Sequence, residues 1–184
     1  MKKRRIRIIL ALFAILCAIY GPQFAHYSIF FTNNTLSAPQ GIYMRVLGEP
    51  EIGNYVVAKL PVDIPEIKGR KGEYLIKKVQ GVTGSQYFVT GNKLTINNKD
   101  YPITHKSYLP QLPKGFYRVK KDHYLLLNDV FNSLDSRYLG EFPKDAVITR
   151  IVLILEYKMI ENFLDRIVKR FTGSLKELKS YESI

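Results

Sequence analysis

Three short segments contain residue types that could do chemistry together. Residues 34–43 read Asn-Thr-Leu-Ser-Ala-Pro-Gln-Gly-Ile-Tyr, so that Ser37 stands close to Pro39 and Gly41. A serine hydroxyl becomes a nucleophile when a neighbouring base removes its proton, and an uncharged amine can be that base. Taken alone, however, a serine beside proline and glycine more often marks a turn.

The second segment, residues 73–82, contains two adjacent lysines among β-forming residues. Alternate residues of a strand share a face, so Lys77 lies with Leu75 and Val79, whereas Lys78 lies on the opposite face. Because removal from water disfavours the charged ammonium, an apolar face lowers the pKa of a lysine. Lys77 is therefore the candidate general base. The alternative is that both lysines are solvated on an edge strand.

The third segment, residues 132–140, reads Asn-Ser-Leu-Asp-Ser-Arg-Tyr-Leu-Gly and combines hydroxyl, acidic and basic side chains. If the segment is extended, Ser133, Asp135 and Arg137 share one face, and the last two can form an ion pair. The simpler interpretation of this segment alone is a polar loop closed by an Asp–Arg contact.

In this order, the three segments resemble the motifs of type I signal peptidases. The shared patterns are Ser-x-Pro, Leu-Ile-Lys-Lys-Val-x-Gly and Asn-Ser-x-Asp-Ser-Arg-Tyr-x-Gly, and residues 53–57 resemble the strand between the serine and lysine motifs. The Ser-x-Pro-x-Gly-hydrophobic-Tyr pattern of residues 37–43 is most similar to the small TraF-type peptidases of conjugative transfer. The sequence departs from general signal peptidases at three places. These enzymes usually have Met where this chain has Ala38, Asp where it has Asn54, and a Gly-Asp-x-Arg run where it has residues 127–130.

The resemblance implies a role for each matching residue. Ser37 would be the nucleophile and Lys77 the general base of a Ser/Lys dyad, while Thr35 would bind the oxyanion beside the Ser37 backbone N–H. Ser133 would orient the lysine through its hydroxyl, and Asp135 and Arg137 would form a supporting ion pair. No cofactor is expected. No metal is expected either, because three isolated histidines and one cysteine match no metal-ligand spacing.

A mostly β domain must position these residues, and we place it at residues 32–155. The segments with the β-branched and aromatic character of strands are 54–60, 73–82, 87–90, 93–96, 117–119, 124–127 and 146–155. Gly91-Asn92 and Asn97-Asn98 are turn signals that would close two short hairpins. The resemblance implies a signal-peptidase-like arrangement of these strands.

Residues 1–31 are predicted to form a basic flank and a membrane anchor. Five cations fall within the first seven residues, and residues 8–20 are apolar or weakly polar. Without a small-x-small site after this run, an uncleaved transmembrane helix is favoured over a signal peptide, and its apolar circumference argues against a buried soluble helix. The flank then places the N-terminus in the cytoplasm and the catalytic domain on the periplasmic side of a bacterial inner membrane.

The tail, residues 156–184, has the spacing of an amphipathic helix. Its apolar stripe consists of Ile160, Phe163, Leu164, Ile167, Val168 and Phe171. Thr172-Gly173 predicts a break, after which Ser174 and Glu177 form a capping-box pattern for a second short helix. We expect the stripe to pack against the β domain, and the alternative is that it lies on a membrane surface.

The predicted function is a membrane-anchored serine endopeptidase that processes membrane-inserted precursors. A net charge of +12 would also suit nucleic acid, but its concentration in the N-terminal flank favours a lipid bilayer as the partner. We expect a precursor protein as the second partner and no nucleic acid, and the resemblance implies a pilin of a conjugative transfer system. Two alternatives remain open: a general secretory signal peptidase, and a non-catalytic anchored β scaffold of a transfer apparatus.

Overall fold

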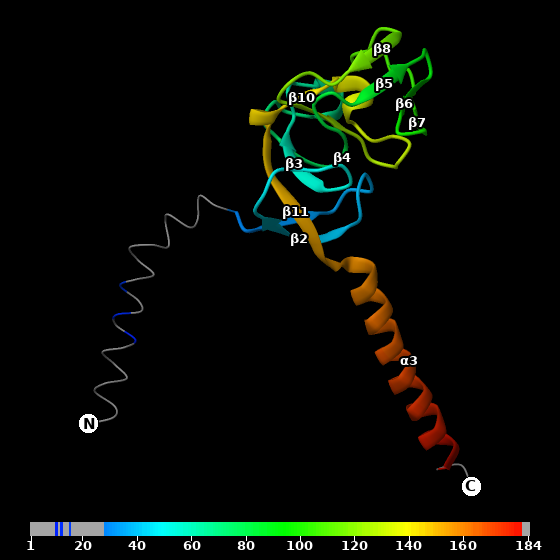
Figure 1. The fold of residues 1–184 in the computed structure, drawn as a ribbon. Coiled ribbons are helices and arrows are strands. Elements are labelled where there is room, and N and C mark those ends of the chain that lie inside the picture. The colour runs from blue at the N-terminus through cyan, green and yellow to red at the C-terminus, as the bar shows by residue number, and fades with distance from the viewer. Residues whose placement is uncertain (1–9, 11, 13–14, 16–27, 182–184) are drawn as a thin grey trace.

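The computed structural model describes residues 10, 12, 15 and 28–181, and it is mostly β, as the sequence predicts (Figure 1). The larger antiparallel sheet contains, in spatial order, β1 (Phe30–Asn33), β2 (Gly41–Val46), β11 (Val147–Glu156), β3 (Tyr55–Lys59), β4 (Tyr74–Gly81), β9 (His123–Leu126) and β10 (Phe142–Pro143). The smaller antiparallel sheet contains, in spatial order, β7 (Lys99–Pro102), β6 (Lys93–Ile96), β5 (Gln86–Val89) and β8 (Gly115–Arg118).

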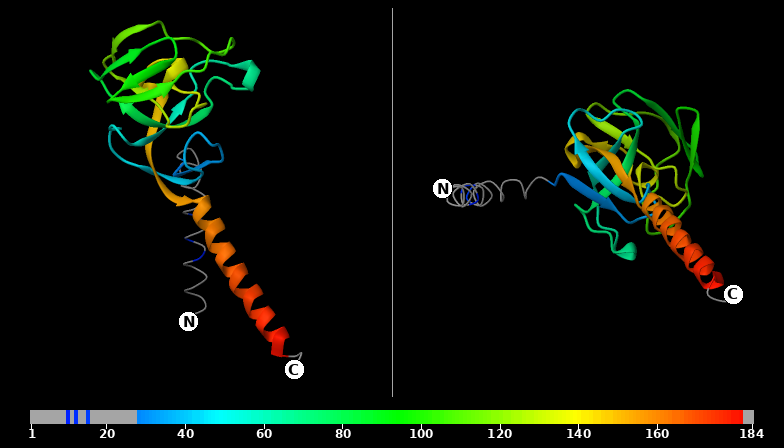
Figure 2. Two further views of the ribbon diagram at one scale, coloured as in Figure 1. Left: turned by 90° about the vertical axis from the view of Figure 1, so that its right-hand side faces the viewer. Right: turned by 90° about the horizontal axis from the view of Figure 1, so that it is seen from below.

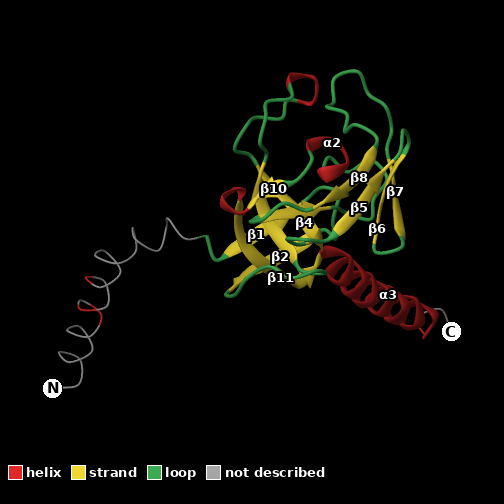
Figure 3. Ribbon diagram, turned by 45° about the horizontal axis from the view of Figure 1, so that its top comes forward, coloured by secondary structure: helices red, strands yellow, loops and turns green. Residues whose placement is uncertain are grey.

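Helices are few in the described part of the chain. Within residues 28–181 the α-helices are α2 (Ser136–Leu139) and α3 (Tyr157–Tyr181). There are also two short 3₁₀ turns, at Pro65–Ile67 and Lys144–Ala146. Figure 3 shows the strands gathered in one body, with α2 beside them and α3 leaving it. All regular secondary structure between the serine and the third chemical segment, except one 3₁₀ turn, therefore belongs to the two sheets.

Every segment predicted as a strand contains one, and the two predicted hairpins are present. Asn97 and Asn98 both have positive φ, at 51° and 59°, in the turn that joins β6 to β7. Asparagine tolerates this left-handed conformation better than most residues do, which explains the turn signal. The strands β1, β2, β7 and β10 were not predicted, and the first two flank Ser37.

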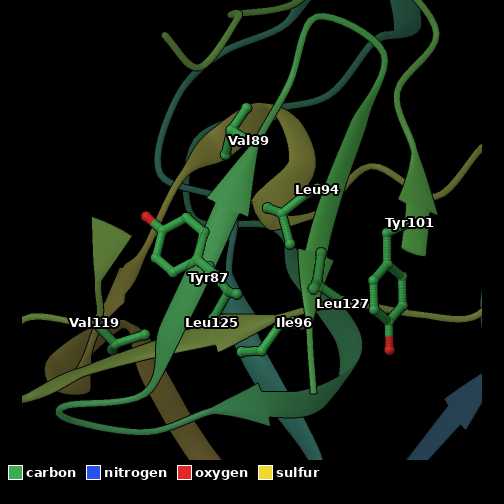
Figure 4. Close-up of a cluster of buried hydrophobic side chains, with 8 residues drawn as sticks. All are labelled: Tyr87, Val89, Leu94, Ile96, Tyr101, Val119, Leu125 and Leu127. Carbon is green, nitrogen blue, oxygen red and sulfur yellow. The ribbon is translucent and has the colours of Figure 1, made fainter. Parts of the chain in front are cut away.

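Strand β9 explains the continuous apolar run near residue 125, because both of its faces are buried. Leu125 and Leu127 belong to the cluster beneath the smaller sheet, which Figure 4 shows with Tyr87 and Leu94. Tyr124 and Leu126 point the other way, into a cluster of the larger sheet. A strand buried on both faces reads as an unbroken hydrophobic run, and this one leads the chain directly to the third chemical segment.

Strand β4 lies between β3 and β9, so it is an interior strand and the edge-strand alternative for its lysines is wrong. Lys77 pairs with Val56 across the sheet, and the Lys77 side chain is 2% exposed. Lys78, on the opposite face, is only partly buried.

The tail differs from two expectations. The helix α3 is continuous from Tyr157 to Tyr181, so the predicted break at Thr172-Gly173 is wrong, and no separate second helix begins at Ser174. The favoured packing of its stripe against the β domain is also wrong, since Phe163 and Leu164 are 59% and 53% exposed. Figures 1 and 2 show α3 extending away from the strands rather than along them.

The predicted membrane anchor lies mostly outside the described residues. Of its apolar run, the structure describes Leu10, Leu12 and Ile15, which are helical and have exposed side chains. Within the described part of the chain, no helix has both the length and the apolar character needed to cross a bilayer.

Candidate active site

Ser37 lies in a loop of residues 34–40, here called the serine loop, which joins β1 to β2. Asn33 and Gly41 are paired partners at its base, so the two antiparallel strands hold its ends together. Asn33 is buried, and its side-chain Nδ2 donates to the carbonyl oxygens of Thr35 (3.1 Å), Ala38 (2.9 Å) and Pro39 (3.2 Å). One amide therefore ties both sides of the serine loop together.

The hydroxyls of Thr35 and Ser37 are 2.9 Å apart. The Thr35 hydroxyl donates its single proton to Asn33 Oδ1 at 2.7 Å, and the Thr35 backbone N–H donates to the same oxygen at 3.1 Å. A hydroxyl has one proton to give, so Ser37 is the donor to Thr35 in this arrangement. Thr35 must release Asn33 before it can donate to a developing oxyanion.

The later residues of the serine motif fix the end of the loop and the close approach of β2 to its sheet neighbour β11. A Cβ at Gly41 would lie 2.2 Å from the Leu155 carbonyl oxygen, so only glycine fits there. Tyr43 is fully buried, and its hydroxyl donates to the Pro39 carbonyl at 2.7 Å. Burial raises the pKa of Tyr43 far above its usual value, which keeps this hydroxyl a neutral donor.

Lys77 is a buried amine with one hydrogen-bond partner in the described part of the chain. Its Nζ donates to the Ser133 Oγ at 2.9 Å. Burial lowers the pKa of Lys77 to about 8, which Asp135 counteracts and Arg137 reinforces. A substantial fraction of these amines is therefore neutral at mildly alkaline pH, the state in which an amine can accept a proton from a hydroxyl.

Asn128 holds the strand on either side of Lys77, and the sequence did not indicate this. Its Oδ1 accepts from the Lys78 N–H at 2.9 Å, and its Nδ2 donates to the Ile76 carbonyl at 3.0 Å. An ionised aspartate could not make the second bond because it has no donor. The asparagine that departs from the Gly-Asp-x-Arg pattern thus has its own role, and its position straight after the buried run of β9 was the available signal.

Asp135 and Arg137 form a buried ion pair behind Lys77. Arg137 Nε donates to Asp135 Oδ1 at 2.8 Å, and Nη2 donates to Oδ2 at 2.7 Å, with side chains 1% and 0% exposed. The segment is not an extended strand, since Asp135 is the N-cap of the short helix α2 and Arg137 lies within that helix, but the ion pair that we expected is present. Arg137 also donates to the carbonyls of Asn128, Val130 and Phe131, so the pair fixes the chain between β9 and α2.

The structure brings Thr35, Ser37 and Lys77 to one pocket of about 520 Å³. Apolar residues of β4 and its neighbours line much of the rest, including Leu75 and Leu134. Ser37 also lines a second hollow of about 380 Å³, together with Tyr55 and Asn128. Among the described residues, no hydrogen bond joins Ser37 to Lys77, because each hydrogen-bonds to another hydroxyl.

Ser133, Asp135 and Arg137 do not line that pocket but lie behind it, against Lys77 and the chain that supports it. No group of three or more His, Cys, Asp or Glu side chains in the described ranges could hold a metal ion. The arrangement suits proton transfer from a hydroxyl to a desolvated amine beside an accessible groove.

Residues 2–156 match the family model described as signal peptidase, peptidase S26. A signal peptidase I of Leptolyngbya laminosa is 29% identical over 105 residues, which are 56% of this chain and 52% of that protein, so the chain spans about half the length of this curated relative. A crystal structure of a signal peptidase I from Enterococcus faecalis is 16% identical, with a TM-score of 0.38, over 58% of this chain and 100% of that one.

Proposed function

The chain belongs to the signal peptidase family, peptidase S26, and from this premise we propose that it is a membrane-anchored serine endopeptidase with Ser37 as nucleophile and Lys77 as general base. The observation that carries the proposal is the buried Lys77 amine, whose lowered pKa is about 8, in the same pocket as the Ser37 hydroxyl. A non-catalytic scaffold gives no reason to keep an amine desolvated beside a hydroxyl.

In the proposed first step, the neutral Lys77 amine takes the Ser37 proton as the serine oxygen attacks the carbonyl carbon of the scissile peptide bond. The resulting oxyanion accepts hydrogen bonds from the Ser37 backbone N–H and the Thr35 hydroxyl. The protonated Lys77 then gives its proton to the leaving amine, and an ester to Ser37 remains. Lys77 next deprotonates a water molecule that hydrolyses this ester, and Ser37 recovers its proton.

The supporting residues set the state of Lys77 in this scheme. The Ser133 hydroxyl accepts from the Lys77 amine at 2.9 Å, which orients the nitrogen without supplying a charge. The Asp135–Arg137 pair and Asn128 hold the surrounding backbone. Substrate binding must turn the Ser37 hydroxyl from Thr35 towards Lys77, in keeping with the looser hydrogen bonds of many active sites without substrate.

The proposed substrate is an extended segment of a membrane-inserted precursor. Ser37 lines both hollows, so a peptide chain that occupies them would pass beside the serine. Strand β1 lies at the edge of the larger sheet and contributes residues to the first hollow, so a substrate strand can add to it by backbone hydrogen bonds.

We propose further that the enzyme acts in a bacterial inner membrane, with its site on the periplasmic side, on pilin-type precursors of a conjugative transfer system. This finer assignment depends on the resemblance of residues 37–43 to the TraF type. In the structure, Pro39 belongs to the serine loop, while Gly41 and Tyr43 of β2 hold its end through a close approach to β11 and a hydrogen bond to Pro39. They therefore support the catalytic class, and the substrate itself requires a direct experiment.

The experiment is to reconstitute the full chain in lipid vesicles, add candidate pilin precursors and a general secretory precursor, and sequence the termini of the products. We expect one cleavage after a small residue, and loss of all product in Ser37→Ala and Lys77→Met. The matched control is Lys78→Met, on the opposite face of the same strand, which should retain activity.

Cleavage that persists in Ser37→Ala would overturn the serine mechanism. Cleavage of the secretory precursor alone would keep the mechanism and replace the pilin assignment with the general signal peptidase alternative. An absence of any cleavage by the parent protein would favour the scaffold.

A further inference from the structure

Helix α3 is not part of the family match, which ends at residue 156, one residue before α3 begins at Tyr157. Nothing in the catalytic scheme uses it either. Yet it is the longest element that the structure describes, and it continues directly from β11 of the larger sheet. Its function must therefore come from its own surface.

The apolar side chains of α3 form one exposed face. Ile160, Phe163 and Leu164 are 36%, 59% and 53% exposed, and Val168 is 58% exposed. At 3.6 residues per turn, these four positions span about 140° of the helix circumference. The opposite side carries polar residues such as Asp165, also exposed. Soluble proteins seldom leave such a stripe in water, so the face indicates a binding surface.

The width of the apolar face and the net positive charge of α3 indicate which kind of partner it binds. A single partner helix in a coiled coil takes a narrower seam of two positions in seven, whereas a face of about 140° fits a flat apolar layer. From Tyr157 to Tyr181 the sequence has six Lys or Arg residues against three acidic ones. An excess of cations around a broad apolar face complements the negative headgroups of an anionic lipid surface.

We propose that α3 is an interfacial helix that lies in the plane of an anionic lipid bilayer, with Ile160, Phe163 and Leu164 in the acyl boundary and its cations at the headgroups. The surface is separate from the active-site pocket, since no residue of α3 lines that pocket. The face therefore binds lipid whether or not the enzyme has a substrate.

The attachment of α3 gives this binding a consequence for the serine loop. The Tyr157 backbone N–H, at the start of α3, donates to the Gln40 carbonyl at 3.0 Å. The preceding Glu156 is the strand partner of Gly41, and Gly41 has no room for even a Cβ against β11. The first turn of α3 thus stays beside the end of the serine loop. If the proposed function holds, lipid-bound α3 keeps the nucleophile near the membrane surface where precursors emerge.

The test uses the fact that the chain contains no tryptophan. Two single-tryptophan variants of the full chain are made, Phe163→Trp on the apolar face and Asn162→Trp on the polar face, both at exposed positions of one helix. Each is reconstituted into phosphatidylglycerol-containing vesicles, with or without lipids brominated in their acyl chains, and fluorescence quenching is measured. The same pair is repeated in a Ser37→Ala background.

We expect the tryptophan at position 163 to shift to shorter wavelength and to lose most of its emission to brominated lipid, while the one at position 162 stays unquenched. The quenching should weaken in vesicles of phosphatidylcholine alone and should not change with Ser37→Ala. Persistence in that variant separates lipid binding from the proposed function, because an inactive enzyme should still bind lipid through α3.

Three outcomes would overturn the proposal. The first is no quenching at either position in any vesicle. The second is equal quenching at both positions, which would mean that the helix enters the bilayer without an orienting face. The third is shielding of position 163 that depends on protein concentration and not on lipid, which would identify a second copy of the chain as the partner.

Discussion

At the scale of single residues, the chemistry depends on how the surroundings of Lys77 remove its charge. Its amine donates to a neutral hydroxyl, Ser133, at 2.9 Å, and the carboxylate of Asp135 is already engaged by Arg137. Desolvation is therefore opposed only weakly, and it is the largest cause of the lowered pKa. A carboxylate paired directly with the amine would have stabilised the ammonium and prevented its use as a base.

The first prediction is a rise of activity with pH. Lys77 acts only when it has lost its proton, so kcat/KM should increase through a midpoint near 8, where the lowered pKa lies, rather than near the ~10.4 of an exposed lysine. Steady-state rates on a cleavable peptide, measured from about pH 6 to about pH 9, report this midpoint in the free enzyme. A rate that is flat or that falls over this range would mean that a neutral Lys77 is not the base.

The second prediction concerns Asn33 as a positioning residue. Asn33→Ala removes the amide that ties together the two sides of the serine loop, and misplacement of a reacting group by about 1 Å can cost about 10² in rate. We expect kcat to fall by about that factor with little change in KM. The neighbouring variant Asn34→Ala is the matched control, because the Asn34 side chain is exposed and only its backbone carbonyl has a hydrogen bond, from Gln40.

Asn33→Asp separates positioning from simple loss of structure. An ionised aspartate keeps the oxygen that accepts from Thr35 but cannot donate to the carbonyls of Ala38 and Pro39. Partial recovery of kcat relative to Asn33→Ala would assign part of the effect to the Thr35 contact. Equal loss of kcat and of thermal stability in all Asn33 variants would contradict a positioning role.

The sequence predicted the candidate dyad more readily than the residues that hold it. Ser37 and Lys77 are found from local patterns, since a motif and the face of one strand suffice. Asn33 and Asn128 act through bonds to chain segments that only the folded sheet brings together, with Asn128 reaching back 52 residues to Ile76. Local patterns do not reveal which distant segments these side chains bind, so the sequence analysis gave neither asparagine a supporting role.

At the scale of elements, the prediction from sequence succeeded where a strand is long or where its turn is distinctive. Strands β4 and β11 have eight and ten residues, with aliphatic or aromatic side chains at many of these positions, and β6 ends in a turn of two asparagines. Strand β1 has only four residues, and β2 follows a loop with proline and glycine. Their identity as strands comes from pairing with each other and with β11, which local sequence does not indicate.

The third prediction tests the ion pair that joins the third segment to the sheets. Asp135→Asn leaves the Arg137 guanidinium buried without a carboxylate, and breaking a buried pair in this way typically costs about 3–5 kcal/mol in the free energy of unfolding. Asp129→Asn is the matched control in the same loop, because its pair with Lys99 is about half exposed and such pairs contribute roughly 0–1 kcal/mol. Denaturant unfolding of both variants measures the difference.

A small, equal loss in the two variants would show that the neutral asparagine at position 135 satisfies Arg137 nearly as well as the carboxylate does. In that case, the carbonyls of Val130 and Phe131, which also accept from Arg137, would be sufficient to hold the loop.

At the scale of the whole molecule, the segments before and after the β domain both combine cations with apolar residues. The first seven residues contain five cations next to an apolar run, and the last helix combines six cations with an apolar face. The β domain between them contains the proposed catalytic groups. The two proposals of a membrane anchor and an interfacial helix fit one arrangement, a bilayer that the N-terminal segment would cross and on whose outer surface α3 would lie.

The fourth prediction follows from that arrangement. Because cations next to an apolar segment stay in the cytoplasm, a reporter enzyme that works only outside the cytoplasm should be active when it is fused after Ile184, and a reporter that works only in the cytoplasm should be inactive there. Changing Lys2, Lys3, Arg4, Arg5 and Arg7 to neutral residues should weaken this preference, whereas neutralising an equal number of cations within the β domain should not.

A fusion that is active only in the cytoplasm would place the β domain inside the cell. It would also separate Ser37 and Lys77 from precursors on the periplasmic side, so the proposed localisation and substrate would be wrong even if the dyad itself were catalytic.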